Sequence, residues 1–135
     1  MADRTLTVAI MDAPYEAAAS TTAFRIIAAA LAKGIDVNVF AYEGAVSLTV
    51  KDQAPHANPV KGTSVEEEQH PTTKDLVAAL VALGATEPKL TWVNCGLCVD
   101  ERGAGNVIDG VKRGSPADFF KMASGTTNTL VIPTR

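Results

Sequence analysis

The chain has 135 residues, of which 47% are hydrophobic and 20% charged, and its formal net charge is −3. This length suits one domain with its own core, and the scattered basic residues argue against a nucleic-acid or anionic-membrane surface. The first residues lack the apolar core of a signal peptide, and no apolar run approaches the ~20 residues that span a bilayer. We therefore expect one cytoplasmic domain over residues 1–135, with no nucleic-acid or membrane partner.

The first third of the chain has the pattern of a strand, a helix and a second strand. Residues 6–11 and 36–42 are mostly apolar runs of strand length. The helix between them starts at Ser20 or earlier and ends at Gly34. The apolar residues that recur in it at helical spacing are Phe24, Ile27 and Leu31. Strand, helix and strand in this order predict a right-handed βαβ unit.

The middle of the chain is less regular. Residues 43–52 fit the alternation of a strand and the face of a helix equally well. Residues 53–71 are polar and proline-rich, and a loop of this length is usually functional or disordered. Thr72 and Asp75 then have the spacing of a capping box, which predicts a helix that ends at Gly84.

Both cysteines of the chain lie where the next strand ends. Residues 90–94 read as a buried strand with Trp92 in the core, and Cys95 and Cys98 follow it directly. Residues 99–102 predict a short helix. A strand-to-helix turn leaves backbone N–H groups without partners, and these groups favour thiolate over thiol. We therefore predict the working site at Cys95, with support from the positive charge of Arg102.

The end of the chain predicts a further strand, helix and strand. Residues 109–112 have the composition of a short edge strand, and residues 129–132 that of a last strand. Between them, Ser115 followed by Pro116 is a strong helix start, and Gly125 ends that helix.

This order of elements predicts a single α/β domain, with a mostly parallel sheet and helices on both faces. In such sheets, chemistry gathers at the carboxyl ends of the strands. Cys95 lies at the carboxyl end of the middle strand and Asp12 at that of the first. We therefore expect the two residues to border one crevice.

Two stretches of the sequence resemble the DsrE/DsrF-like, TusD-related sulfur-relay family. The first begins at Ala13-Pro14-Tyr15 and continues through the alanine-rich helix to Val46, and the second is Cys95-Gly96-Leu97-Cys98-Val99-Asp100-Glu101-Arg102-Gly103. The Arg-Gly spacing matches Cys95, and not Cys98, to the family's sulfur-carrying cysteine. The resemblance implies a five-stranded parallel sheet, a persulfide on Cys95 and a homo-oligomer, either a trimer or a hexamer. Its partners would be sulfur donor and acceptor proteins.

The resemblance also bears on individual residues. It implies a helical structure for residues 43–52. Our leading hypothesis gives catalytic roles to Cys95, Cys98 and Arg102, in which Cys98 attacks the persulfide and releases sulfide, and it places Tyr15 and Gly96 at the crevice with Asp12.

Alternative functions remain open from the residues themselves. A CxxC pair that opens a helix is also the arrangement of a dithiol redox protein, which would form a Cys95–Cys98 disulfide. A non-catalytic binding module would use the crevice and the loop of residues 53–71 instead. His56 and His70 have no recognised ligand spacing with the cysteines, so we expect no metal. Nucleotide-binding glycine motifs are absent, so we expect no cofactor.

Overall fold

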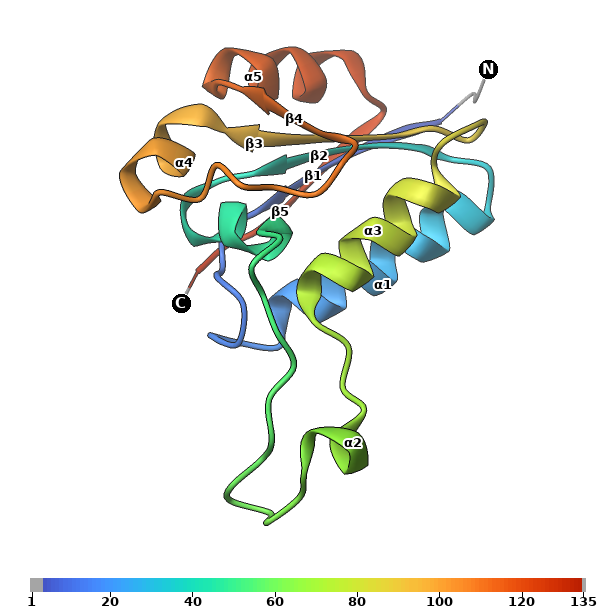
Figure 1. The fold of residues 1–135 in the computed structure, drawn as a ribbon. Helices are drawn as coiled ribbons and strands as arrows, with labels where there is room; N and C mark the ends of the chain where they lie inside the picture. The colour runs from blue at the N-terminus through green and yellow to red at the C-terminus, as the bar shows by residue number, and fades with distance from the viewer. Residues whose placement is uncertain (1–3, 135) are drawn as a thin grey trace.

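Five short strands rich in apolar and β-branched residues pair into one parallel sheet in the order β4-β3-β2-β1-β5 (Figure 1). The computed structural model describes residues 4–134. The strands are β1 (Thr5–Ile10), β2 (Asp36–Ala41), β3 (Leu90–Cys95), β4 (Val111–Gly114) and β5 (Asn128–Ile132). The predicted five-stranded sheet is confirmed, but β2 is its middle strand, because the chain moves outward from β1 to β4 and then crosses back to β5.

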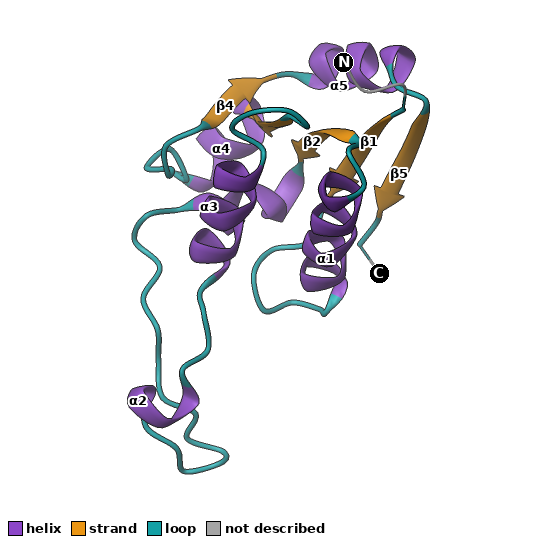
Figure 2. Ribbon diagram, turned by 90° about the vertical axis from the view of Figure 1, so that its right-hand side faces the viewer, coloured by secondary structure: helices purple, strands orange, loops and turns teal. Residues whose placement is uncertain are grey.

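Helices cover both faces of the sheet, as predicted. Helices α1 and α3 pack side by side on one face, and α5 lies on the other (Figures 1 and 2). The helices are α1 (Ala19–Ala32), the 3₁₀ helix η1 (Glu43–Thr49), α2 (Val65–Glu68), α3 (Thr73–Leu83), α4 (Gly96–Arg102) and α5 (Pro116–Gly125). Among residues 4–134, none of these helices has the length and apolar character needed to cross a membrane.

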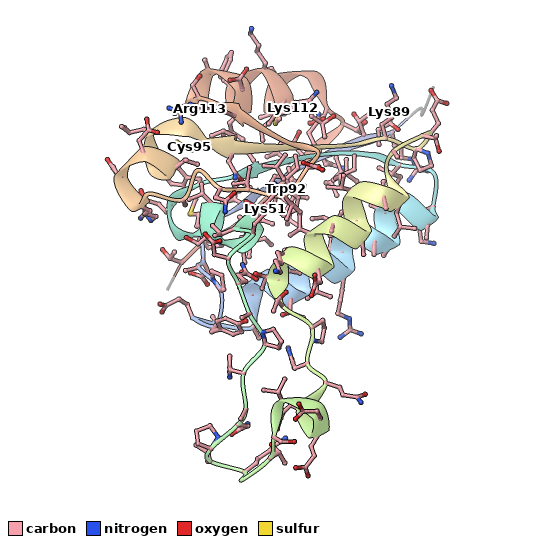
Figure 3. All side chains as sticks on the ribbon, in the orientation of Figure 1. Lys51, Lys89, Trp92, Cys95, Lys112 and Arg113 are labelled. Carbon is pink, nitrogen blue, oxygen red and sulfur yellow. The ribbon has the colours of Figure 1, made fainter. Side chains whose placement is uncertain are left out.

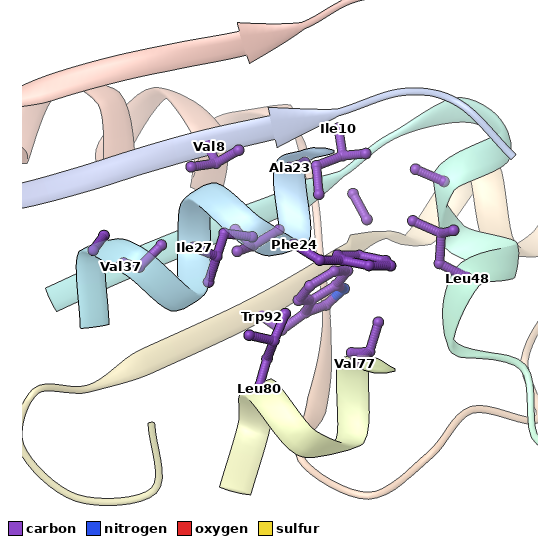
Figure 4. Packing of buried hydrophobic residues seen from close by; sticks show 14 of the residues in the cluster. Val8, Ile10, Ala23, Phe24, Ile27, Val37, Leu48, Val77, Leu80 and Trp92 are labelled. Atoms are coloured by element: carbon purple, nitrogen blue, oxygen red, sulfur yellow. The ribbon is translucent and has the colours of Figure 1, made fainter. Parts of the chain in front are cut away.

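The main core fills the space between the sheet and the α1–α3 layer (Figure 4). Trp92 of β3 is buried there, as predicted, and its ring centroid lies 6.2 Å from that of Phe24. The indole N–H donates to Asn94 Oδ1 at 3.1 Å, and Asn94 Nδ2 donates to Thr49 Oγ1 at 3.0 Å. Because buried polar groups cost free energy unless they are bonded, this chain of bonds ties η1 to the end of β3.

A second cluster forms on the face that α5 covers. Phe40 of β2 stacks on Phe119 of α5 with their centroids 5.4 Å apart, and Val93 and both cysteines belong to this cluster. The alternation of side chains along β3 therefore sends Trp92 to one face, and Val93 and Cys95 to the other.

Helix α1 begins at Ala19, so the earlier of its two predicted starts is confirmed and Ser20 is not the cap; the buried hydroxyl of Ser20 donates to the carbonyl of Asp12 at 3.3 Å. The predicted start of α4 was wrong: the helix begins at Gly96 instead of Val99, so Cys98 lies inside it.

The strand predicted at residues 109–112 is β4, shifted to Val111–Gly114 by its pairing with β3. Residues 43–52 contain the helix η1, as the family resemblance implied. The start of α5 is confirmed: Ser115 N–H donates to Asp118 Oδ2 at 2.8 Å, and Pro116 is the first helical residue.

The polar segment of residues 53–71 projects from the body of the domain and carries the short helix α2 (Figures 1 and 2). At its base, Thr72 is the N-cap of α3, but its hydroxyl donates to Asp75 Oδ2 at 2.8 Å and makes no bond to the helix backbone. The predicted capping box is therefore present in spacing but not in its hydrogen bonds.

Candidate functional site

The two cysteines meet at the junction of β3 and α4. Cys95 is the last residue of β3 and the N-cap of α4, and Cys98 lies in the first turn of that helix. Both are free thiols, and they are only 3% and 5% exposed. Both sulfurs lie in one apolar cluster, where the neighbouring Cys95 helps to raise the pKa of the Cys98 thiol. The structure thus brings the two predicted sulfur residues together, but it buries both of them in the apolar cluster under α5.

The hydrogen bond that a backbone N–H makes to sulfur goes to Cys98. The N–H of Glu43 donates to Cys98 Sγ at 3.2 Å, whereas the Cys95 side chain makes no capping bond to the described backbone of α4. The predicted position of Cys95 at a strand-to-helix turn is confirmed, although its side chain makes no capping bond there. Burial and the neighbouring Cys95 raise the pKa of the Cys98 thiol, and the Glu43 N–H lowers it by less. Cys98 is held as a protonated thiol at neutral pH.

Backbone geometry directs the Glu43 N–H to the sulfur. Glu43 has a φ of 55°, in the left-handed region that non-glycine residues avoid. A Cβ on the next residue, Gly44, would lie 2.8 Å from Ala13 Cβ, so this turn also requires a glycine. Such strain costs about 1–3 kcal/mol and is maintained by the surrounding structure, often at functional sites.

Arg102 connects α4 to η1. Its Nη2 donates to Glu43 Oε2 at 2.9 Å, and its Nη1 donates to the carbonyl of Cys98 at 3.4 Å. The guanidinium therefore lies on the Cys98 side of the cysteine pair. The Glu43 carboxylate that it bonds also raises the pKa of the neighbouring Tyr42 hydroxyl, mainly through its charge.

A pocket of about 840 Å³ opens at the carboxyl ends of β1 and β2. Asp12, Glu43 and Arg102 are among its lining residues, and among the described residues neither cysteine lines it. Asp12 therefore lines this pocket, whereas Cys95 and Gly96 do not, and the crevice expected to join Asp12 and Cys95 is not found among the described pockets. The strand β2 lies between the strands that carry the two residues.

Tyr15 lies apart from that pocket. It lines a smaller one, of about 170 Å³, at the base of the projecting segment, where its ring centroid lies 5.7 Å from that of His56. His70 lines the same small pocket. Within residues 4–134, no group of three or more histidine, cysteine, aspartate or glutamate side chains is placed to hold a metal ion.

Arg113 of β4 is a residue beside the cysteine-bearing turn that the sequence reasoning did not single out; Figure 3 labels it at the same end of the sheet as Cys95. Its guanidinium lies against Gly96, where an added Cβ would be 2.7 Å from Nε, and it donates to both oxygens of Asp100 at 2.8 and 2.6 Å. These bonds lower the pKa of the Asp100 carboxyl. The sequence did contain a signal for Arg113, because this cation directly follows the edge strand predicted at residues 109–112. Parallel strands end at one edge of the sheet, so a residue at that position is expected near the end of the cysteine-bearing strand.

Known proteins are similar to this chain over nearly its whole length. A model of the DsrE/DsrF-like family matches residues 5–129. The uncharacterized protein MJ0989 of Methanocaldococcus jannaschii is 28% identical over 128 residues, which are 93% of this chain and 97% of that protein. Among solved structures, the ychN protein from E. coli is similar with a TM-score of 0.69 and 19% identity, over 95% of this chain and 98% of that one. At this identity, the structural likeness concerns the fold alone.

Proposed function

The chain belongs to the DsrE/DsrF-like family, and from this premise we propose that it is a sulfur carrier or sulfurtransferase that holds a sulfane sulfur as a persulfide on Cys95. The membership supports sulfur relay as the general activity. The observation that carries the finer assignment is the pair of free thiols at the carboxyl end of β3, which lie in one apolar cluster.

Two features favour Cys95 as the carrier. It ends a parallel strand, at the edge of the sheet where α/β proteins place their chemistry, whereas Cys98 lies inside the following helix. In addition, burial raises the pKa of the Cys98 thiol, which reduces its thiolate fraction and makes it the poorer nucleophile at neutral pH.

The proposed reaction moves one sulfur in two exchange steps. The Cys95 thiolate attacks the outer sulfur of a donor persulfide, so that Cys95–S–SH forms and the donor leaves as a thiolate. An acceptor thiolate then attacks the outer sulfur on Cys95 and regenerates the Cys95 thiolate. If Cys98 as thiolate instead attacks the inner sulfur, a Cys95–Cys98 disulfide forms and hydrosulfide leaves.

Burial sets a condition on this reaction. Because Cys95 is 3% exposed, a donor sulfur reaches it only when part of the surrounding apolar cluster moves. Leu97 lies between the two cysteines in the first turn of α4 and is 67% exposed, although it is apolar. A partner protein that contacts Leu97 would therefore act on the turn that carries Cys98.

Mass spectrometry after incubation with glutathione persulfide tests the assignment. We expect the mass of one added sulfur on the peptide that carries Cys95, the same gain in Cys98→Ser, and none in Cys95→Ser. Uptake by Cys95→Ser at the rate of the parent chain would show that the assignment is wrong.

A second candidate function is dithiol redox chemistry, which the position of both free thiols in one cluster favours. It predicts the loss of two hydrogens across Cys95 and Cys98 in the same experiment, with equal dependence on both residues. A binding module that uses the 840 Å³ pocket predicts no change in mass.

We also propose the assembly and setting that family membership implies. These are a cytoplasmic homo-oligomer, either a trimer or a hexamer, that works with sulfur donor and acceptor proteins. Phe120 on α5 and Val131 on β5 are apolar and exposed in the single chain, which supports an assembly that covers them. Size-exclusion chromatography with light scattering measures the number of copies, and a monomer at all concentrations would contradict this proposal.

A further inference from the structure

The pocket of about 840 Å³ is rich in carboxylates. It lies at the end of the sheet where the loop after β1 meets the start of η1 (Figure 1). Among the described residues that line it, the charged ones are Asp12, Glu16, Glu43 and Arg102. Arg102 donates to Glu43 Oε2 at 2.9 Å, so this cation is already bonded to one of the three carboxylates. The described lining therefore has an excess of negative charge, which Asp12 and Glu16 carry.

Asp12 is a buried carboxylate without a partner in the protein. The residue is only 8% exposed, yet its carboxylate makes no hydrogen bond or ion pair within residues 4–134. Its backbone carbonyl is the group that accepts the bond from Ser20. In the described part of the chain, no side-chain oxygen is both sealed from solvent and unbonded. The Asp12 carboxylate is therefore reached by solvent from the pocket that it lines.

A carboxylate in this state indicates a cationic ligand. A charged group that loses most of its water costs free energy unless a partner of opposite charge compensates for the loss. A single metal ion does not fit, because the described residues contain no group of three or more acidic, histidine or cysteine side chains placed to hold one. The carboxylates of this pocket therefore do not converge on one point. A ligand that meets more than one of them needs positive charges that are separated from each other.

The remaining lining suits an alkyl chain between such charges. Met11, Ala13 and Ala17 give the pocket an apolar part. Its volume of about 840 Å³ lies within the range of roughly 300–1,000 Å³ that small-molecule sites occupy. The wall is also fixed by the backbone, since the N–H of Ala45 in η1 donates to the carbonyl of Met11 at 3.1 Å. The site is thus formed without a ligand.

We propose that this pocket binds a small organic dication, an alkyl chain that carries two ammonium groups. One ammonium group bonds the buried carboxylate of Asp12. The second bonds Glu16, which is exposed and lines the more open part of the pocket, and the methylene groups pack on the apolar residues between them. The proposal goes beyond the sulfur chemistry, because among the described residues neither cysteine lines this pocket.

Isothermal titration calorimetry of the full chain at low salt tests the proposal with three probes. Diaminobutane carries two ammonium groups, butylamine carries one, and butanediol carries none, while all three have the same carbon chain. We expect diaminobutane to bind about tenfold more tightly than butylamine, and butanediol not to bind. Binding should also weaken as the salt concentration rises, because salt screens the partly exposed charges. Butanediol binding as tight as that of diaminobutane overturns the proposal.

Three variants identify the carboxylates that bind the probe. Asp12→Asn removes the buried charge at nearly constant shape, and Glu16→Gln removes the exposed one. Glu66→Gln is the matched control, since Glu66 is an exposed carboxylate on α2 outside this pocket. We expect each pocket variant to lower the affinity for diaminobutane about tenfold, and Glu66→Gln to match the parent. Equal affinities of the parent and Asp12→Asn, or an equal loss in Glu66→Gln, overturn the proposal.

The melting temperature of Asp12→Asn checks the state of the carboxylate without any ligand. Because this variant removes a buried charge that has no partner, it should melt at the temperature of the parent or above it. Diaminobutane should raise the melting temperature of the parent and leave that of Asp12→Asn unchanged. A lower melting temperature of Asp12→Asn without ligand would show that the carboxylate is bonded within the protein, and would overturn the proposal.

Discussion

The main-chain N–H of Glu43 donates to the sulfur of Cys98 across 3.2 Å and thereby joins η1 to α4. Glu43 has a left-handed backbone conformation, which costs conformational free energy in a residue other than glycine, and the Cys98 thiol that accepts the bond is buried. This bond fixes the position of the Cys98 sulfur, which lies in the same apolar cluster as Cys95. It also makes the two cysteines chemically unequal.

Cys98 should ionise only above the range of an ordinary thiol. Burial and the neighbouring Cys95 favour its neutral form, so its pKa is raised and its thiolate fraction at neutral pH is small. In a pH series of iodoacetamide labelling, read by peptide mass spectrometry, we expect Cys98 to reach half of its maximal rate at a higher pH than the same peptide in the urea-unfolded chain. A lower midpoint in the folded chain would contradict the description of Cys98 as a protonated thiol.

The sign of this shift also predicts an effect on stability. Because the folded state raises the pKa of Cys98, its contribution to stability is present below the unfolded thiol pKa and is lost as pH rises through the folded value. The free energies of unfolding in urea of the parent and of Cys98→Ser should therefore converge as the pH increases through the alkaline range. A difference between the two free energies that stays constant across that range would show that Cys98 ionisation is not linked to folding.

The Arg102–Glu43 ion pair should contribute little to stability. Glu43 is 46% exposed at its side chain, and exposed pairs are screened by water. For Arg102→Gln, Glu43→Gln and the double variant, we expect a coupling free energy of at most about 1 kcal/mol in urea unfolding. A coupling well above this value would mean that the pair acts as a buried contact between η1 and α4.

Asn94 should matter far more for stability than an exposed asparagine. Asn94→Ala leaves the indole N–H of Trp92 and the hydroxyl of Thr49 without this partner in the core, at a cost of about 1–3 kcal/mol in unfolding free energy. The matched control is Asn106→Ala, whose amide bonds the exposed carboxylate of Asp52 and whose loss should cost about 0.5 kcal/mol or less. Equal costs would argue against the buried network.

Two glycines at the ends of helices should respond in opposite directions to alanine. At Gly84, after α3, an added Cβ would lie 2.6 Å from the backbone nitrogen of Leu90, so Gly84→Ala should destabilise by about 1–3 kcal/mol. At Gly125, the last residue of α5, nothing lies within 4 Å and φ is not positive, so Gly125→Ala should be neutral or stabilise by up to about 1 kcal/mol. The melting temperatures of the two variants compare them directly. A decrease for Gly125→Ala equal to that for Gly84→Ala would contradict the open space beside Gly125.

Local patterns were enough to predict the five strands, the three long helices and the place of the cysteines, but not the short helix α2, whose capping box at Ser64 lies in the segment expected to be a loop. The spacing of Phe24, Ile27 and Leu31 and the start signal at Ser115 depend on neighbours within a few residues, and α1 and α5 form where these signals stand. The start of α4 was not predicted correctly, because the helix begins at the buried Gly96 and not at Val99.

What the sequence by itself determined is therefore the α/β class, the parallel sheet with helices on both faces, and a cysteine pair at a strand-to-helix junction. The tertiary structure alone decided that β2 is central, that both sulfurs are buried, that Glu43 bonds Cys98, and that Arg113 lies beside Gly96. The physical reason is distance along the chain. Strand order and register bring together residues that are far apart in sequence, and no periodicity or capping signal within one segment specifies which of them will meet.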